Sequence, residues 1–266
     1  TAAAGNAGGG ALYAEDVFST YLYEGNGSTQ TITNGIDLDG EGGLVWIKAR
    51  EPSGGGNRSH VLSDTDRGAT KSLFSDTVGA ELTYADIITS FNSDGFTSGG
   101  SVLTNYASVD FASWTFRKAE KFFDVVTWTG DGTGARTISH SLNGTVGALF
   151  MKATNAAMQW FSYHNGLTNA QFLELNATTQ AVSSVNAWNN TTPTSSEFTV
   201  GSYGNISGRT YVAYLFASDA GGFGDDGDES IIKCGSYTGN GGSQEINLGF
   251  EPQWLMVKRT NDVGSW

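Results

Sequence analysis

One sequence pattern occurs three times in this chain, and it constrains the fold more than any other feature. Each copy has a glycine-rich turn, a spacer, and a four-residue apolar run that ends in lysine. The glycine that opens each turn is Gly25, Gly130 or Gly239, so the copies are 105 and 109 residues apart. A solenoid unit has roughly 20–50 residues, so a period this long indicates a repeated domain.

The repeat predicts the domain organisation. The predicted divisions are a Gly/Ala-rich linker at 1–13, a first module at 14–121, a second at 122–228 and an incomplete third at 229–266. The ends of the complete modules align without gaps and match four pairs of residues: Asn105 and Asn205, Phe111 and Tyr211, Trp114 and Tyr214, Phe116 and Phe216. The third stretch is too short to bury a sandwich core, so we expect further polypeptide or a neighbour to complete it.

Composition indicates an all-β fold. The chain has 37 glycines, 3 prolines and only 15% charged residues, with 12% aromatics. Short runs such as 44–47, 148–151 and 254–257 are typical of strands covered on both faces. The Gly-Asn-Gly and Gly-Asp-Gly turns suit tight hairpins. We therefore predict tandem two-sheet β-sandwiches, with a jelly-roll or concanavalin-like lectin shape favoured over an immunoglobulin-like one.

Charge and cysteine content narrow the function classes. The formal net charge of −13 disfavours binding to a phosphate backbone. No apolar run approaches the roughly 18 residues of a membrane span, so no membrane insertion is expected. The single cysteine, Cys234, cannot form an intrachain disulfide and is expected to act as a small apolar strand residue.

Five stretches resemble a known group of proteins. They are Gly25–Ile32 with Gly43–Arg50, Tyr211–Ala217 with Gly222–Gly227, and Asn247–Thr260. Together they are similar to the repeated modules of tail-fibre and other virion appendage proteins of marine, cyanophage-like bacteriophages. The resemblance implies a lectin-like β-sandwich, a structural role in the virion and contact with a host surface. It implies no catalytic residues.

Two groups of side chains are candidates for ligand binding. Trp160, Tyr163 and His164 in the second module correspond to the region of His60, Asp64 and Arg67 in the first. Aromatic and polar side chains on sandwich loops can stack on and hydrogen-bond a sugar ring. The alternative is that Trp160 and Tyr163 are core residues and that Asp64 and Arg67 form a local ion pair.

Other charged positions have simpler interpretations beside the functional ones. Asp225, Asp226 and Asp228 offer oxygen ligands for Ca²⁺, although their spacing is not that of an EF-hand and a solvated linker is the alternative. No other cofactor is expected. The repeated lysines, Lys48, Lys152 and Lys258, are interpreted as strand-end charges that keep a sheet edge soluble, with contact to an acidic glycan as the alternative.

The sequence thus predicts a non-enzymatic structural protein of a phage tail fibre, located in the virion and mediating attachment to the host. The expected partners are other virion proteins, further copies of the chain in a homo-oligomer, and host-surface glycans. The alternatives are a carbohydrate-binding, lectin-like adhesin module and a polysaccharide depolymerase. No His-Glu-x-x-His, Gly-x-Ser-x-Gly or Walker A sequence is present.

Overall fold

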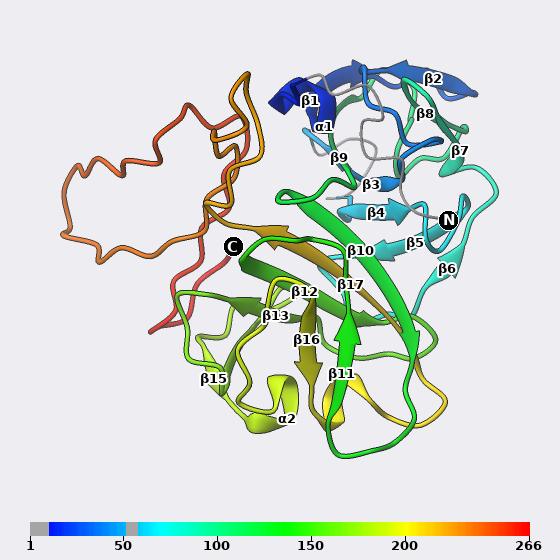
Figure 1. Ribbon diagram of the computed structural model, residues 1–266. Helices are drawn as coiled ribbons and strands as arrows, with labels where there is room; N and C mark the ends of the chain where they lie inside the picture. The colour runs from blue at the N-terminus through cyan, green and yellow to red at the C-terminus, as the bar shows by residue number, and fades with distance from the viewer. Residues whose placement is uncertain (1–10, 52–57) are drawn as a thin grey trace.

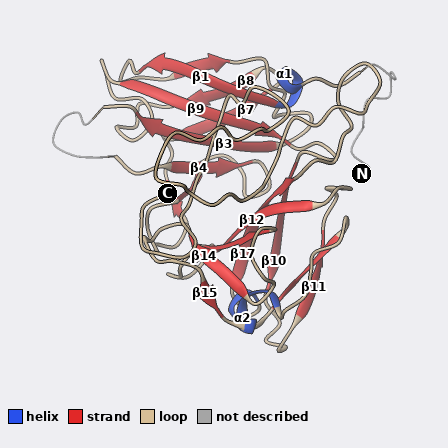
Figure 2. Ribbon diagram, turned by 90° about the vertical axis from the view of Figure 1, so that its left-hand side faces the viewer, coloured by secondary structure: helices blue, strands red, loops and turns tan. Residues whose placement is uncertain are grey.

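The computed structural model describes residues 11–51 and 58–266, and the regular secondary structure in this part of the chain is almost entirely β-strand (Figures 1 and 2). Residues 1–10 of the predicted linker lie outside the described residues. The first unit contains α1 (Ala14–Val17), β1 (Phe18–Glu24), β2 (Gln30–Thr33), β3 (Gly43–Ala49), β4 (Val61–Asp64), β5 (Lys71–Phe74), β6 (Leu82–Thr83), β7 (Ile88–Asn92), β8 (Gly95–Ser98) and β9 (Asp110–Arg117). The second contains β10 (Phe123–Thr129), β11 (Arg136–Ser139), β12 (Val146–Ala153), β13 (Phe161–His164), β14 (Gln171–Glu174), β15 (Val182–Ser183), α2 (Val185–Trp188), β16 (Glu197–Val200), the 3₁₀ turn η1 (Ser202–Gly204) and β17 (Thr210–Ala217). None of the described helices is long and apolar enough to cross a membrane.

The two units have the same strand order. The first unit's large sheet runs β1-β9-β3-β4-β5-β6, and the second unit's runs β10-β17-β12-β13-β14-β15. Each large sheet packs its inner face on a smaller one, β2-β8-β7 in the first unit and β11-β16 in the second. All of these strand pairs are antiparallel, so the predicted all-β sandwich is confirmed.

The apolar runs are the central strands of the large sheets, as their composition predicts. Strand β3 lies between β9 and β4, and β12 lies between β17 and β13. Every residue of β12 is buried, and only Lys48 of β3 is partly exposed. Because successive side chains alternate between the two faces of a strand, these strands must be covered twice.

The second cover is the other unit. The outer faces of the two large sheets pack on each other, and Phe116 of β9 meets Phe216 of β17 with ring centroids 5.4 Å apart. We call this shared apolar layer the central core. Its buried members come from both units: Val17, Leu44, Trp46, Leu62, Leu73, Phe116, Phe122, Phe123, Val125, Ala148, Phe150, Trp160, Leu175, Val212, Tyr214, Phe216 and Phe223.

A buried asparagine holds the glycine-rich turn in each unit. The Asn205 side-chain oxygen accepts from the amide of Asp131 at 3.1 Å, and its Nδ2 donates to the carbonyl oxygen of Thr133 at 3.0 Å. In the first unit Asn105 makes the corresponding bonds to Asn26 and Ser28. Both asparagines are almost fully buried. The repeated asparagine is therefore a structural residue that fixes a turn.

Replacing Asn205 with alanine is expected to lower the free energy of unfolding by about 2–3 kcal/mol, because buried turn groups lose their partners. Asn155→Ala is a matched control: this exposed side chain also bonds the backbone, at Gly208 and Thr210, but water can replace it. Urea denaturation measures both variants. Equal losses in the two would contradict the assigned role of the buried asparagine.

The third copy does not form strands. Residues 230–266 contain no strand in the structure, although the run 254–257 has the apolar pattern of β3 and β12. Figure 1 shows this segment in orange and red, running outwards from the second unit and back. The prediction of a strand there is wrong, since β3 and β12 are each paired on both sides and residues 229–266 contain no counterpart of β9 or β17.

Candidate functional site

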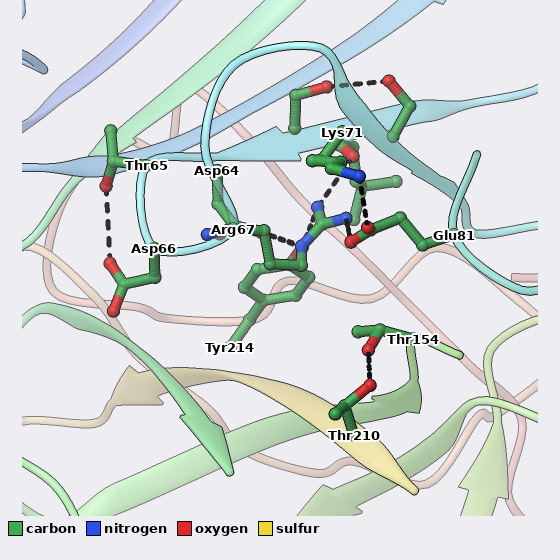
Figure 3. Close-up of polar contacts among 12 residues, drawn as sticks. Asp64, Thr65, Asp66, Arg67, Lys71, Glu81, Thr154, Thr210 and Tyr214 are labelled. Atoms are coloured by element: carbon green, nitrogen blue, oxygen red, sulfur yellow. Dashed lines mark hydrogen bonds and ion pairs between the residues drawn. The ribbon is translucent and has the colours of Figure 1, made fainter. Parts of the chain in front are cut away.

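A buried ionic network joins the two units beside the central core (Figure 3). The Arg67 Nε lies 2.6 Å from Asp64 Oδ2, and its Nη1 lies 3.0 Å from Glu81 Oε2. From the second unit, the Tyr214 hydroxyl donates to Asp64 at 2.7 Å and accepts from Arg67 Nη2 at 3.1 Å. The side chains of Asp64 and Arg67 are 0% and 5% exposed. The network therefore satisfies a buried charge with groups from both units.

The charges of the network follow from its surroundings. Burial acts to lower the pKa of Arg67, but the charge and hydrogen bond of Asp64, together with Tyr214 and Glu81, outweigh burial and raise the pKa. Burial also raises the pKa of Tyr214 well above its ordinary value. At neutral pH the guanidinium is therefore charged and the phenol neutral. The sequence places Asp64 and Arg67 on a binding loop, but the structure places them in the interface between the units.

Trp160 and His60 occupy equivalent positions just before β13 and β4, and Trp160 is also an interface residue. The Trp160 side chain is fully buried, and its indole N–H donates to the carbonyl oxygen of Phe74 in the first unit at 2.9 Å. His60 Nδ1 accepts from the Trp46 indole at 2.9 Å, and its ring stacks on Trp114. Burial, followed by the charge of Lys48, lowers the pKa of His60. A sugar cannot stack on a buried Trp160, so this part of the predicted site is wrong.

The remaining two predicted ligand residues lie on different faces of β13. Tyr163 is 4% exposed and packs edge-on against Trp188 in the second unit's own core. His164 is half-buried, and its Nδ1 accepts from the amide of Gly166 at 2.9 Å. Of the six predicted ligand residues, the structure brings Asp64 and Arg67 into direct contact, and it does not bring the six together as one binding surface.

The acidic loop does not form a metal site. Asp225, Asp226 and Asp228 are exposed, on a tight hairpin closed by the pairing of Phe223 with Glu229. The Tyr13 hydroxyl donates to Asp225. Across residues 11–51 and 58–266, no group of three His, Cys, Asp or Glu side chains is placed to hold a metal ion. The structure therefore fits the solvated-linker alternative, because these exposed carboxylates on a short hairpin do not converge on one point.

The repeated lysines bond backbone carbonyls. Lys152 is fully buried, and its Nζ donates to the carbonyl oxygens of Ala153 at 3.0 Å and of Val78 in the first unit at 3.3 Å. Lys48 donates to Ala49 and Lys258 to Thr178. Since β3 and β12 are central strands, the prediction of edge-strand charges is wrong for Lys48 and Lys152.

Burial, with a smaller effect of Arg209, lowers the pKa of Lys152 to about 8. An unfolded lysine has a pKa of about 10.4, so between these values the unfolded chain binds more protons than the folded one. The free energy of unfolding should therefore rise with pH between about 8 and 10, relative to the variant Lys152→Met. Urea titrations across this range check the difference. Parallel curves for the two proteins would contradict the buried charge.

Two open hollows lie along β10 and share Asp66 and Thr127 in their linings, and we call the two together the groove. One end is a hollow of about 370 Å³ lined by Asp66, Lys118, Asp124, Val125, Val126, Thr127, Ile138, Ser139, His140 and Ser141. The other, of about 400 Å³, is lined by Asp66, Arg67, Glu81, Thr127, Trp128, Thr129, Thr154, Thr210 and Tyr211. Both units supply its walls, so the groove exists only when the units are packed together.

The chemistry of the groove is polar. Lys118 Nζ lies 3.3 Å from Asp66 Oδ1 and 3.5 Å from Asp124 Oδ1. Burial raises the pKa of Asp66, although Lys118 opposes it. Hydroxyls line the far end, where Thr154 and Thr210 are hydrogen-bonded at 2.5 Å (Figure 3). Sequence reasoning missed Asp66, Lys118 and Asp124, because nothing in the repeat marks them and they converge only through packing.

The fold and this junction define a class of protein: an all-β chain of two sandwich units joined through a shared core. Residues 14–266 match the family model described as Domain of unknown function (DUF7483), and the chain belongs to that family. The match extends across both units and the C-terminal segment, residues 229–266. Comparison with curated proteins and with solved structures gives no significant match.

Proposed function

We propose that this chain is a non-enzymatic structural component of a bacteriophage virion appendage, a tail fibre, that takes part in attachment to the host. The observation that supports it most is that the repeated positions are scaffold positions. The turn glycines, the buried asparagines and the central strands recur, whereas the polar residues of the groove do not. The chain thus duplicates a framework and no chemical site.

The packing of the units fits a load-bearing role. A sandwich unit joined by a linker alone could pivot, since interfaces between domains are commonly small and polar. Here an aromatic layer and a buried ion pair join the units. Such a body keeps the two units in a fixed relative orientation, as a segment of a fibre must. Assembly with other virion proteins and with further copies of the chain belongs to this proposal.

Immunogold labelling of purified particles tests the location. Antibody raised against the 266-residue chain should label the appendages, and antibody pre-absorbed with the chain should not. Mass spectrometry of gradient-purified virions should detect the chain in constant ratio to the capsid protein. Its presence in infected-cell lysate but not in purified particles would refute the proposal.

The groove supports a second candidate function, binding of a host-surface glycan. Carboxylates, an amine and several hydroxyls line it, and these groups hydrogen-bond the hydroxyls of a sugar. Weak binding by single copies would gain from avidity in an oligomer. The buried Trp128 offers no exposed ring for stacking, so recognition would rest on hydrogen bonds.

A glycan array probed with an oligomeric form of the chain tests this second function. We expect binding that the double substitution Asp66→Asn with Lys118→Met abolishes. Asp110→Asn, which changes an exposed carboxylate outside the groove, should leave it unchanged. Binding that survives the double substitution would exclude the groove. If the same samples release reducing sugar, and the release depends on Asp66 and Asp124, the chain is a depolymerase and the non-enzymatic proposal is wrong.

A further inference from the structure

All three histidines of the chain use the same ring nitrogen in the same way: Nδ1 accepts a hydrogen bond from an N–H group. The acceptors and their donors are His60 with the indole of Trp46 at 2.9 Å, His140 with the amide of Leu142 at 3.2 Å, and His164 with the amide of Gly166 at 2.9 Å. Indole and backbone N–H groups can only donate, so each Nδ1 carries a lone pair and each ring is neutral. A proton on Nδ1 would set a donor against a donor.

The hydrogen bond of His60 orients a ring on which the C-terminal segment packs. The Trp46 ring contacts both His60 and Trp254, with ring centroids 5.9 and 6.2 Å from its own. Two charged groups act on His60: Lys48 of β3 disfavours its protonation, and Asp76, which follows β5, favours it. A protonated His60 loses the indole hydrogen bond and repels the N–H of the ring that seats Trp254.

The turn that His164 closes lies against the same segment. A Cβ on Gly166 would lie 3.0 Å from His164 Nδ1 and 3.3 Å from the Cβ of Ser236. The imidazole, the turn and the C-terminal segment are therefore in close contact. Burial alone, among effects from the described residues, lowers the pKa of His164. Protonation of this ring opens the turn beneath Ser236.

The C-terminal segment is held by side chains and single hydrogen bonds, without a strand ladder. Residues 230–266 form no strand. Trp254 packs on Phe216 with ring centroids 6.4 Å apart, and the Trp266 indole donates to the carbonyl oxygen of Glu174 at 2.9 Å. Segments with few backbone hydrogen bonds open at a lower free energy than core strands. A change at two contact points can therefore release this segment while both units stay folded.

We propose that His60 and His164 form an acid-sensitive switch: their neutral rings keep the C-terminal segment on the central core, and their protonation releases it. The direction follows from proton linkage. A histidine freed from its partner has a pKa of about 6.5. The pKa values of both histidines are lowered in the folded chain, so the released form binds more protons in mild acid. The seated segment is fully stable above about pH 6.5 and loses stability as the pH falls towards the lowered pKa values.

Fluorine NMR of the chain labelled with 5-fluorotryptophan tests the switch. Trp254 and Trp266 lie on the segment, whereas Trp128 and Trp188 lie in the second unit's own core. As the pH falls from about 7.5 to about 5, across the range in which histidine titrates, the signals of Trp254 and Trp266 should move to the position of exposed tryptophan. The signals of Trp128 and Trp188 should keep their positions. Replacing each tryptophan singly with phenylalanine assigns the signals.

Asparagine removes the titration and keeps an acceptor near the Nδ1 position. The first unit already makes this exchange: Asn34 is the counterpart of His140, and the side chains of both accept from the amide two residues further on at 3.2 Å. The double variant His60→Asn with His164→Asn should lower the midpoint of release by about one pH unit or more. The single variant His164→Asn, at a half-buried position, should lower it by less. His140→Asn should leave it unchanged, because this ring stacks on Phe198 within the second unit.

Three results would overturn the proposal. The first is that the Trp254 and Trp266 signals do not move over this pH range. The second is that the midpoint is the same in the original chain, in His164→Asn and in the double variant, which would assign the release to carboxylates. The third is that all seven tryptophan signals move together, which would show acid unfolding of the whole chain.

Discussion

Replacing Asp64 with alanine is expected to lower the free energy of unfolding by about 3–5 kcal/mol, because it leaves the Arg67 guanidinium buried without its closest charge partner. The Arg67 side chain is 5% exposed, so water cannot take the place of the carboxylate. The Tyr214 hydroxyl also loses its acceptor at 2.7 Å. Urea denaturation followed by circular dichroism measures the loss.

The exposed pair of Arg50 and Asp110 is the matched control. Its atoms are 3.7 Å apart and its side chains are 49% and 48% exposed. Asp110→Ala should cost about 1 kcal/mol or less, because exposed ion pairs contribute little. The double variant Asp64→Ala with Arg67→Met should recover part of the loss, since it removes the unpaired charge. A loss for Asp64→Ala no larger than the control's would contradict a buried network between the units.

Truncating Phe216 to alanine is expected to cost about 3–5 kcal/mol, since it opens a cavity in the central core. The ring is 2% exposed and lies 5.1–5.4 Å, centroid to centroid, from Phe123, Phe150 and Phe116. Trp254 stacks on it at 6.4 Å. The variant should therefore destabilise both units and loosen the C-terminal segment. Thermal unfolding and Trp fluorescence report these effects.

Tyr21→Ala controls for the loss of an aromatic ring from a strand. Tyr21 lies on edge strand β1 and is 37% exposed, so its removal should cost about 1 kcal/mol or less. If Phe216→Ala destabilised the second unit and left the first at its original stability, the two sheets would not share a core.

Sequence reasoning could reach the β-structure because the signals are local. Glycine turns and apolar runs with alternating faces identify strands from neighbouring residues alone, and the pairing of Asn105 with Asn205 follows from alignment of the copies. The same apolar runs do not show which face of the strand packs on the unit's own core and which packs on the other unit. In β3, Val45 and Ile47 face that core while Leu44 and Trp46 face the other unit, and all four are apolar. Packing between units is therefore invisible in composition.

The binding-site predictions failed for a related reason. Trp160 looks like an exposed sugar-stacking residue only if the outer face of its sheet meets water, and here that face meets the first unit. Asp64 and Arg67 are three residues apart, which suggested a weak surface pair, but Tyr214 from the second unit helps to bury them. The groove residues Asp66 and Asp124 are 58 positions apart, and only the packing of the units places both beside Lys118.

The central claim is that the two units form one body through a shared core. Hydrogen exchange at increasing urea concentrations, read separately for peptides from β3 and from β12, tests it most directly. The account predicts that both strands lose protection in a single transition at the same urea concentration, and that Phe216→Ala shifts both midpoints by the same amount. Two separate transitions, with β3 still protected where β12 has unfolded, would contradict it.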